Sequence, residues 1–221
     1  MTSADDETRQ RAEARLITRW RQLEPDLIED GIVEPKCYFA VSKKVLFLLK
    51  EPNDAGGGYW DMRPWIRDGA RWQSWNNITR WTQVILSHPQ PFEWGALEFV
   101  DEEDRKNTLR NIAIVNVKKA PGGGAAIRRD ILAAAKQNAA LIREQIALAA
   151  PDIVILCGDP LEKVYENIYG EINCEWIMGP HNRRVMKGEK SPDVISFYHP
   201  ARGSKKERCE QLADLLTALS N

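Results

Sequence analysis

Four short apolar runs, separated by longer amphipathic segments, place the tightest limit on the fold of this chain. The runs are residues 45–49, 112–117, 153–157 and 194–198. Each is rich in β-branched residues and leucine and is bounded by Gly, Pro or polar residues, which is typical of a strand buried on both faces. Apolar residues at helical spacing lie in the segments 6–27, 76–87, 130–149 and 205–219. Alternating strands and helices predict a mainly parallel sheet covered on both faces.

The chain of 221 residues is expected to form one domain, because no repeat, low-complexity tract or linker divides it. The predicted fold class is α/β: a three-layer αβα sandwich with a mainly parallel central sheet of about four strands. Residues 1–35 are expected to form an amphipathic helical segment packed on that domain. Residues 55–75 are rich in glycine, arginine and tryptophan without a period, so we expect a long loop there.

We expect a soluble protein in the cytoplasm, and we expect it to act as a monomer. Charged residues make up 29% and hydrophobic residues 43% of the chain. The apolar runs are too short to span a bilayer, and the first residues lack the basic and apolar regions of a signal peptide. None of the four cysteines lies in a CxxC pair, so we expect no zinc or iron–sulfur site, no metal and no cofactor.

The net charge of −1 hides an uneven distribution along the chain. Residues 1–35 hold nine acidic side chains and five arginines. Residues 181–208 hold eight lysines and arginines against three acids, and residues 116–130 hold four against one. Such clusters are either solvated surface or the positive face of a nucleic-acid-binding protein.

Polar side chains follow the predicted strands where each strand ends. Glu51 and Asn53 follow the first strand, Asn116 ends the second, and His199 follows the fourth. Any one of them alone could be a surface acid, a turn cap or a histidine of the packed interior. Because the carboxyl ends of parallel strands meet at one edge of a sheet, their combination favours a single cleft.

Four ordered blocks of sequence resemble the motifs of the uracil-DNA glycosylase superfamily. They read FLLKEPND at 47–54, NVKKAP at 116–121, DIVILCGDP at 152–160 and FYHPARGSKK at 197–206. The first resembles the motif Gly-x-(Asn/Asp/Ala)-Pro, and the last resembles His-Pro-Ser with its duplex-probing loop. Leu49 replaces the usual glycine and Glu51 the usual Asn, Asp or Ala, and the cysteines of the iron–sulfur branches are missing. The resemblance therefore implies a divergent branch, of which the phage-defence DNA glycosylases are one candidate.

The resemblance assigns chemical roles to residues of these blocks. Hydrolysis of an N-glycosidic bond passes through a cationic sugar while the base leaves as an anion. Glu51, with Asp54 as the second candidate, would stabilise the cation and orient water, and His199 would stabilise the oxyanion of the base. The expected base-binding residues are Asn116, Asn53, Tyr59 and Trp60. Asn116 would offer both a donor and an acceptor to the base edge.

DNA is the expected partner, in single- or double-stranded form. Arg202 lies where the superfamily inserts a wedge into the base stack. The expected contacts to phosphates are Ser204, Lys205, Lys206, Lys118, Lys119, Arg128 and Arg129. The glycines at 56–58 would leave room for a base larger than uracil.

The expected function is that of a monofunctional DNA glycosylase that leaves an abasic site. The favoured substrate is a hypermodified cytosine, such as the glucosylated hydroxymethylcytosine of phage DNA, in an anti-phage defence role. Repair of uracil or another deaminated base is the first alternative. A DNA- or nucleotide-binding module without catalysis and an enzyme acting on free nucleosides are the others.

Overall fold

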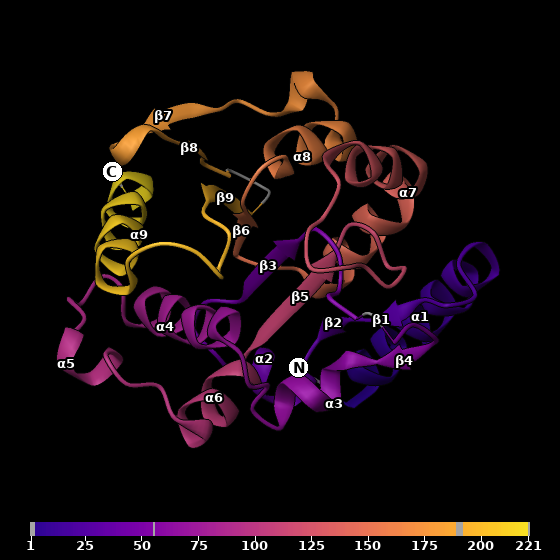
Figure 1. The fold of residues 1–221 in the computed structure, drawn as a ribbon, viewed down its shortest axis with the longest axis horizontal. Coiled ribbons are helices and arrows are strands. Elements are labelled where there is room, and N and C mark those ends of the chain that lie inside the picture. The colour runs from indigo at the N-terminus through magenta and orange to yellow at the C-terminus, as the bar shows by residue number, and fades with distance from the viewer. Residues whose placement is uncertain (1–2, 55, 189–191, 221) are drawn as a thin grey trace.

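A seven-stranded sheet forms the centre of the computed structural model, which describes residues 3–54, 56–188 and 192–220. The strand order in this described part is β2-β5-β3-β6-β9-β8-β7 (Figure 1). The bounds are β2 Gly31–Ile32, β3 Val45–Leu49, β5 Ile112–Asn116, β6 Ile153–Cys157, β7 Ile177–Gly179, β8 Arg183–Met186 and β9 Asp193–Phe197.

The four strands predicted from the apolar runs form the parallel core of this sheet. β5, β3, β6 and β9 pair in parallel, and Val45 of β3 lies beside Ile112 and Ile153. Their side chains are almost completely buried, as expected for strands covered on both faces. The prediction of about four strands undercounts the sheet, because β2 and the β8–β7 pair extend it in antiparallel fashion. These added strands are short or carry arginines, so they lack the apolar run that identifies a central strand.

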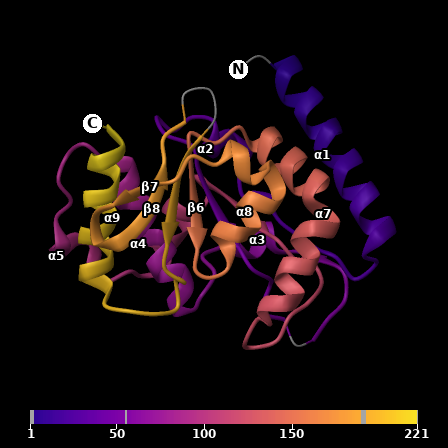
Figure 2. The ribbon, with the colours of Figure 1, turned by 90° about the horizontal axis from the view of Figure 1, so that it is seen from above.

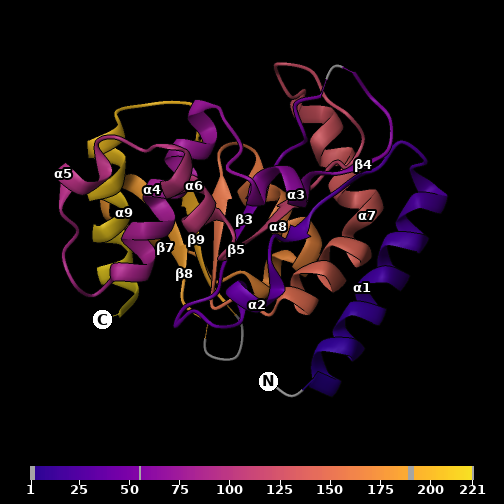
Figure 3. The same ribbon diagram turned by 90° about the horizontal axis from the view of Figure 1, so that it is seen from below.

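Helices cover both faces of the sheet, which confirms the α/β class. α1 (Ser3–Leu23), α7 (Arg128–Ala149) and α8 (Leu161–Tyr169) lie on one side, and α4 (Gln73–Ser87), α6 (Glu102–Leu109) and α9 (Lys205–Ser220) on the other (Figures 1 and 3). The shorter helices are α2 (Pro35–Tyr38), α3 (Met62–Arg67), α5 (Trp94–Leu97), η1 (Glu171–Asn173) and η2 (Pro180–Asn182). None of the described helices combines the length and apolarity needed to cross a membrane.

The N-terminal segment packs on the rest of the chain. α1 lies along the outside of α7 (Figure 2), and its Leu16 and Trp20 are completely buried. β1 (Ile28–Glu29) then pairs with β4 (Trp60–Asp61) in a separate small sheet, and β2 joins the edge of the main sheet. This segment therefore reaches the end of β5, where Asn116 lies.

Residues 55–75 are not the long loop that we expected. Apart from residue 55, which lies outside the described residues, they contain β4, α3 and the start of α4. Asp61 caps α3 by accepting a hydrogen bond from the backbone of Arg63 at 2.9 Å. Pro64 lies in the first turn of α3, where a missing N–H costs nothing. The cap and the proline are the local signals of a helix start that the missing periodicity conceals.

Candidate active site

A cavity of about 1000 Å³ opens at the carboxyl ends of the parallel strands. The predicted site residues that line it are Glu51, Asn53, Asp54, Trp60, Asn116, Arg128, His199 and Arg202. The predicted residues outside its lining are Tyr59, Lys118, Lys119, Arg129, Ser204, Lys205 and Lys206. The cavity therefore brings together the candidate catalytic residues but only part of the expected DNA contacts.

Glu51 lies at the floor of this cavity. An ion pair with Lys118 and the nearby backbone of Gly122 hold its side chain in place. Its side chain is only 8% exposed, and its Oε2 lies 2.7 Å from Nζ of Lys118. A Cβ atom at Gly122 would lie 2.3 Å from Cδ of Glu51, so only glycine fits against this carboxylate. Lys118, expected to contact phosphate, is instead the cationic partner of Glu51.

The chain beyond β3 is fixed by the loop that follows β5. The amide of Gly122 donates to the carbonyl of Pro52 at 2.9 Å, and the amide of Asp54 donates to the carbonyl of Gly122 at 3.1 Å. Asn53 and Gly122 form a parallel bridge that continues the pairing of the two strands. Glu51 therefore lies between backbone hydrogen bonds and has little freedom to move.

Asp54 has a local structural role in this arrangement. Its Oδ1 accepts the amide of Gly56, and its Oδ2 accepts the indole N–H of Trp60, both at 2.9 Å. Both oxygens are therefore used to shape the loop. The described glycines at 56–58 do not line the cavity, whereas Gly123 and Gly124 of the other loop do, so the expected widening by residues 56–58 is not seen.

His199 is held as a neutral imidazole with a defined tautomer. Burial, assisted by the nearby charges of Lys50 and Arg202, lowers the pKa of His199 to about 4. The amide of Ala201 donates to Nδ1 at 3.2 Å, so the ring proton resides on Nε2. Nε2 is thus free to donate to an oxygen of a bound ligand.

A buried network fixes the loop that carries His199. Asn77 of α4 donates to the carbonyl of Pro200 at 2.6 Å, and Arg80 donates to the side-chain oxygen of Asn77 at 3.0 Å. Arg80 also donates to the carbonyls of Leu97 and Glu98. Since Asn77 and Arg80 are 3% and 2% exposed, these bonds compete little with water.

Asn116 lies at the end of β5 and is held from behind by the N-terminal segment. Its backbone amide and its side-chain Nδ2 both donate to Oδ2 of Asp30, at 2.7 and 2.9 Å. Nδ2 also approaches the sulfur of Met62 at 3.6 Å. The expectation that Asn116 offers a donor as well as an acceptor to a base is wrong for this arrangement, because its donor is already used.

The position of Lys119 contradicts the expectation that it contacts phosphates. Its side chain is 1% exposed and pairs with Asp30, and it also donates to Gln145 at 2.9 Å and lies 4.6 Å from the ring centre of Trp20. Burial lowers the pKa of Lys119, and the charge of Asp30 opposes that effect. An ammonium enclosed in this way supports the fold and cannot contact DNA phosphates.

Four tryptophans form an aromatic wall of the cavity: Trp60, Trp65, Trp72 and Trp75. The ring of Trp65 meets those of Trp60, Trp72 and Trp75 edge to face, at 6.3, 5.7 and 5.6 Å. Trp72 is 58% exposed. Tyr59, a predicted base-stacking residue, lies outside the wall, donates to Glu29 and carries Arg21 over its ring. Sequence reasoning found Trp60 and missed the other three tryptophans, because only the residues directly after the first block were considered.

A pair of arginines at the cavity was also missed. The guanidinium carbons of Arg183 and Arg208 lie 3.6 and 3.2 Å from the ring centre of Tyr198. At such distances they must occupy opposite faces of the ring, and the Nε of each is buried without a hydrogen-bond partner. All three residues line the cavity. The basic cluster at 181–208 was the available signal, but it did not single out these two residues.

The remaining predicted DNA contacts lie at the surface. Arg128 pairs with Asp159, and Arg129 pairs with Asp130 at 3.1 Å. Lys205 and Lys206 begin α9 next to Ser204, and all three are exposed. Lys206 has Glu210 at 3.8 Å. These side chains are accessible to a polyanion.

The described residues contain no group of three or more His, Cys, Asp or Glu side chains placed to hold a metal ion. The arrangement is instead that of a carboxylate, a neutral imidazole and an amide around a large cavity with an aromatic wall. A scan against models of protein families finds none that matches this chain, and a search of curated proteins finds no similar sequence.

Proposed function

We propose that this protein is a DNA glycosylase of a divergent branch of the uracil-DNA glycosylase superfamily. The observation that carries the proposal is that Glu51, Asn116 and His199, which lie at or just after the ends of three different strands, line one cavity. The order of the four sequence blocks and the parallel sheet that joins them agree with that superfamily. The proposed role is removal of a hypermodified cytosine, as in defence against phage.

The roles of the residues follow from their surroundings. As the glycosidic bond breaks, the sugar becomes cationic and the bonding electrons leave with the base. The carboxylate of Glu51 stabilises that cation and orients the water that attacks the anomeric carbon. The Nε2–H of His199 donates to the carbonyl oxygen of the departing base, where negative charge develops. The attacking water gives up a proton that neutralises the departing base anion, so the products are the free base and an abasic site.

The size and walls of the cavity favour a large base. Pockets for small ligands commonly have volumes of roughly 300–1,000 Å³, and this cavity of about 1000 Å³ lies at the upper end. The faces of Trp65 and Trp72 are suited to packing against a second ring, such as a hexose attached to the base. Arg183 and Arg208 place two positive charges at the cavity, which suits the phosphates that flank a flipped nucleotide.

Incubation with defined DNA tests the proposal. We expect wild-type protein to create alkali-labile sites in DNA that contains glucosylated hydroxymethylcytosine, in single or double strands, and fewer in uracil DNA. Glu51→Gln should abolish base release and retain DNA binding. Asp54→Asn is the comparison, since its carboxylate serves the loop and the variant should keep most of the activity.

The possible outcomes separate the alternatives. Efficient action on uracil DNA alone would assign the protein to uracil repair. Tight binding by the wild type with no abasic product from any substrate would leave a binding module. Release of the base from free nucleosides, without dependence on a polynucleotide or on salt, would identify a nucleoside hydrolase.

A further inference from the structure

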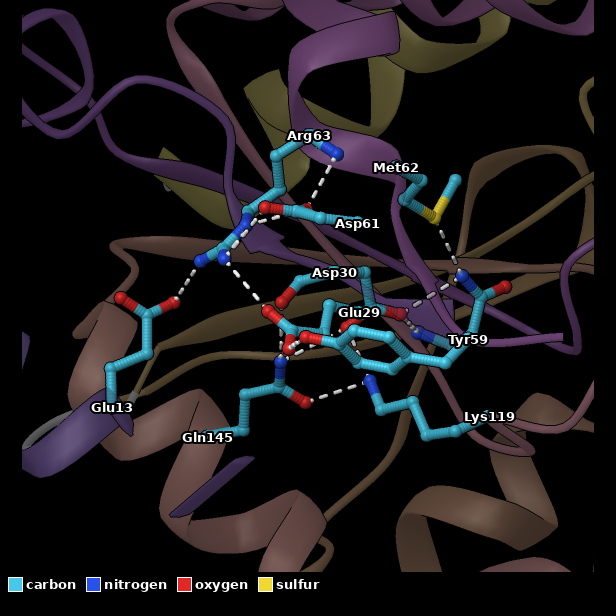
Figure 4. A network of polar contacts seen from close by, with 10 residues as sticks. Glu13, Glu29, Asp30, Tyr59, Asp61, Met62, Arg63, Lys119 and Gln145 are labelled. Carbon is cyan, nitrogen blue, oxygen red and sulfur yellow. Dashed lines mark hydrogen bonds and ion pairs between the residues drawn. The ribbon is translucent and has the colours of Figure 1, made fainter. Parts of the chain in front are cut away.

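The carboxylate of Asp30, behind the cavity, is surrounded by N–H donors (Figure 4). One oxygen accepts the backbone amide and the side-chain Nδ2 of Asn116, at 2.7 and 2.9 Å. The other accepts Nζ of Lys119 and, at 2.9 Å, Nε2 of Gln145. Asp30 is completely buried, so water does not replace any of these donors.

This carboxylate determines which way the amide of Asn116 faces. An ionised carboxylate only accepts hydrogen bonds, so the group of Asn116 that meets it must be the NH₂. The opposite orientation would place the side-chain carbonyl of Asn116 against a carboxylate, losing a charge-assisted hydrogen bond and adding repulsion. Asp30 therefore locks the amide in one orientation before any ligand binds.

Only an acceptor of Asn116 is left for a ligand. Its NH₂ meets Asp30 at 2.9 Å and the sulfur of Met62 at 3.6 Å, which occupies both hydrogens. Its Oδ1 is buried and has no hydrogen-bond partner, although the residue lines the cavity. A buried carbonyl without a donor is costly, and a ligand that supplies the donor removes that cost.

We propose that Asp30 is a specificity-determining residue that makes Asn116 a fixed acceptor, so that the cavity selects a pyrimidine with an exocyclic amino group at C4. The selected class is thus cytosine derivatives and not uracil derivatives. This inference rests on the proposed function and narrows its substrate.

The two classes of base differ at the edge that Asn116 meets. A cytosine derivative has an amino group at C4, which donates to Oδ1 of Asn116 and satisfies it. A uracil derivative has a carbonyl at C4, which would face another carbonyl. It can reach Oδ1 only with its N3–H, and its O4 then receives no donor from this amide. The cytosine derivative thus leaves no group at this edge unpaired, whereas the uracil derivative leaves O4 without a donor, and this difference is what the site discriminates.

The sharpest test uses two oligonucleotides that differ only at C4. One contains 5-hydroxymethylcytosine and the other 5-hydroxymethyluracil, so that the C5 substituent and the sequence are the same. Base release by wild-type protein and binding by the Glu51→Gln variant are measured on both. We expect a preference for the cytosine member of roughly 10- to 100-fold in both measurements.

Variants separate the orientation of Asn116 from general stability. Asn116→Ala should bring the preference close to one, and Asp30→Asn should reduce it by letting the amide of Asn116 turn. Gln145→Met is the matched control, because it removes donors from Asp30 and leaves the contact with Asn116. This control should lower the melting temperature and keep the preference.

The two measurements distinguish the inference from the function on which it rests. Equal or stronger binding of the uracil member by Glu51→Gln would overturn the inference, whatever the activity of the wild type. A cytosine preference in binding with no base release by wild type would uphold the recognition by Asn116 and refute the glycosylase. A preference that persists in Asn116→Ala would also overturn the assignment.

Discussion

The floor and the rim of the cavity are held in different ways. At the floor, Asn116 is bonded to buried Asp30, and the loop of His199 is bonded to buried Asn77. At the rim, Trp72 is 58% exposed and Arg202 makes no ion pair within the part of the chain that the structure describes. The floor is therefore arranged before a ligand arrives, which suits groups that act on a transition state. The rim can adapt to the shape of a long ligand.

After loss of the Glu51 carboxylate, loss of the imidazole at the floor should have the largest effect. We expect His199→Ala to lower the rate of base release by roughly two to three orders of magnitude, the scale of removing one oxyanion donor. Single-turnover assays on the preferred substrate would measure it. His181 is the matched control, because it pairs with Asp214 at 2.7 Å and does not line the cavity. A normal rate for His199→Ala would assign the oxyanion to another donor.

Displacing the carboxylate should cost less than removing the imidazole. In Gly122→Ala the new methyl group would lie 2.3 Å from Cδ of Glu51, so the carboxylate must move. We expect a decrease in the rate of roughly 10- to 100-fold, because small misplacements of a catalytic group are costly. Gly123→Ala is the control, since a Cβ there meets no atom within 4 Å. Equal activity of the two variants would show that the position of Glu51 is not critical.

His199 should also make the free energy of unfolding of the protein depend on pH. Its pKa is about 4 in the folded protein against an ordinary value of 6.5. As the pH falls from 6.5 towards 4, the unfolded chain binds a proton that the folded chain does not, so the free energy of unfolding decreases. Melting temperatures across this range should fall less in His199→Asn than in wild type. The same fall in both proteins would contradict a buried neutral imidazole.

Changes at the surface beyond the rim should have the smallest effects and should alter the salt dependence of DNA binding. Replacing Lys205 and Lys206 with glutamine should weaken binding to all DNA sequences alike, by roughly tenfold, and lower the slope of affinity against log salt by about two. Lys136→Gln, on the exposed side of α7, is the control. An unchanged salt slope in the double variant would mean that the start of α9 does not meet DNA.

The sequence could predict the strands that position the floor of the cavity but not the contacts that hold its side chains. Apolar runs predicted the parallel strands, and hence the edge where Glu51 and His199 lie, because a buried strand has a local signature. The pairing of Asp30 with Asn116 joins residues 86 positions apart, and no local spacing encodes it. Lys119 follows Lys118 directly, yet one is buried and the other pairs with Glu51. A charge count cannot separate two such neighbours.

Arg63 also determines how the cavity can open. Its guanidinium bonds Glu13 of α1, Glu29 of β1 and Asp61 beside it, at 2.7, 3.0 and 2.8 Å (Figure 4). The part of the wall that carries Trp60 and Met62 therefore moves only together with the N-terminal helix, or after several ion pairs break at once. Farther along the same wall, the exposed indole of Trp72 contacts the ring of Trp65 at 5.7 Å. A flipped nucleotide should thus be admitted by displacement of Trp72, while the part of the wall tied to α1 stays in place.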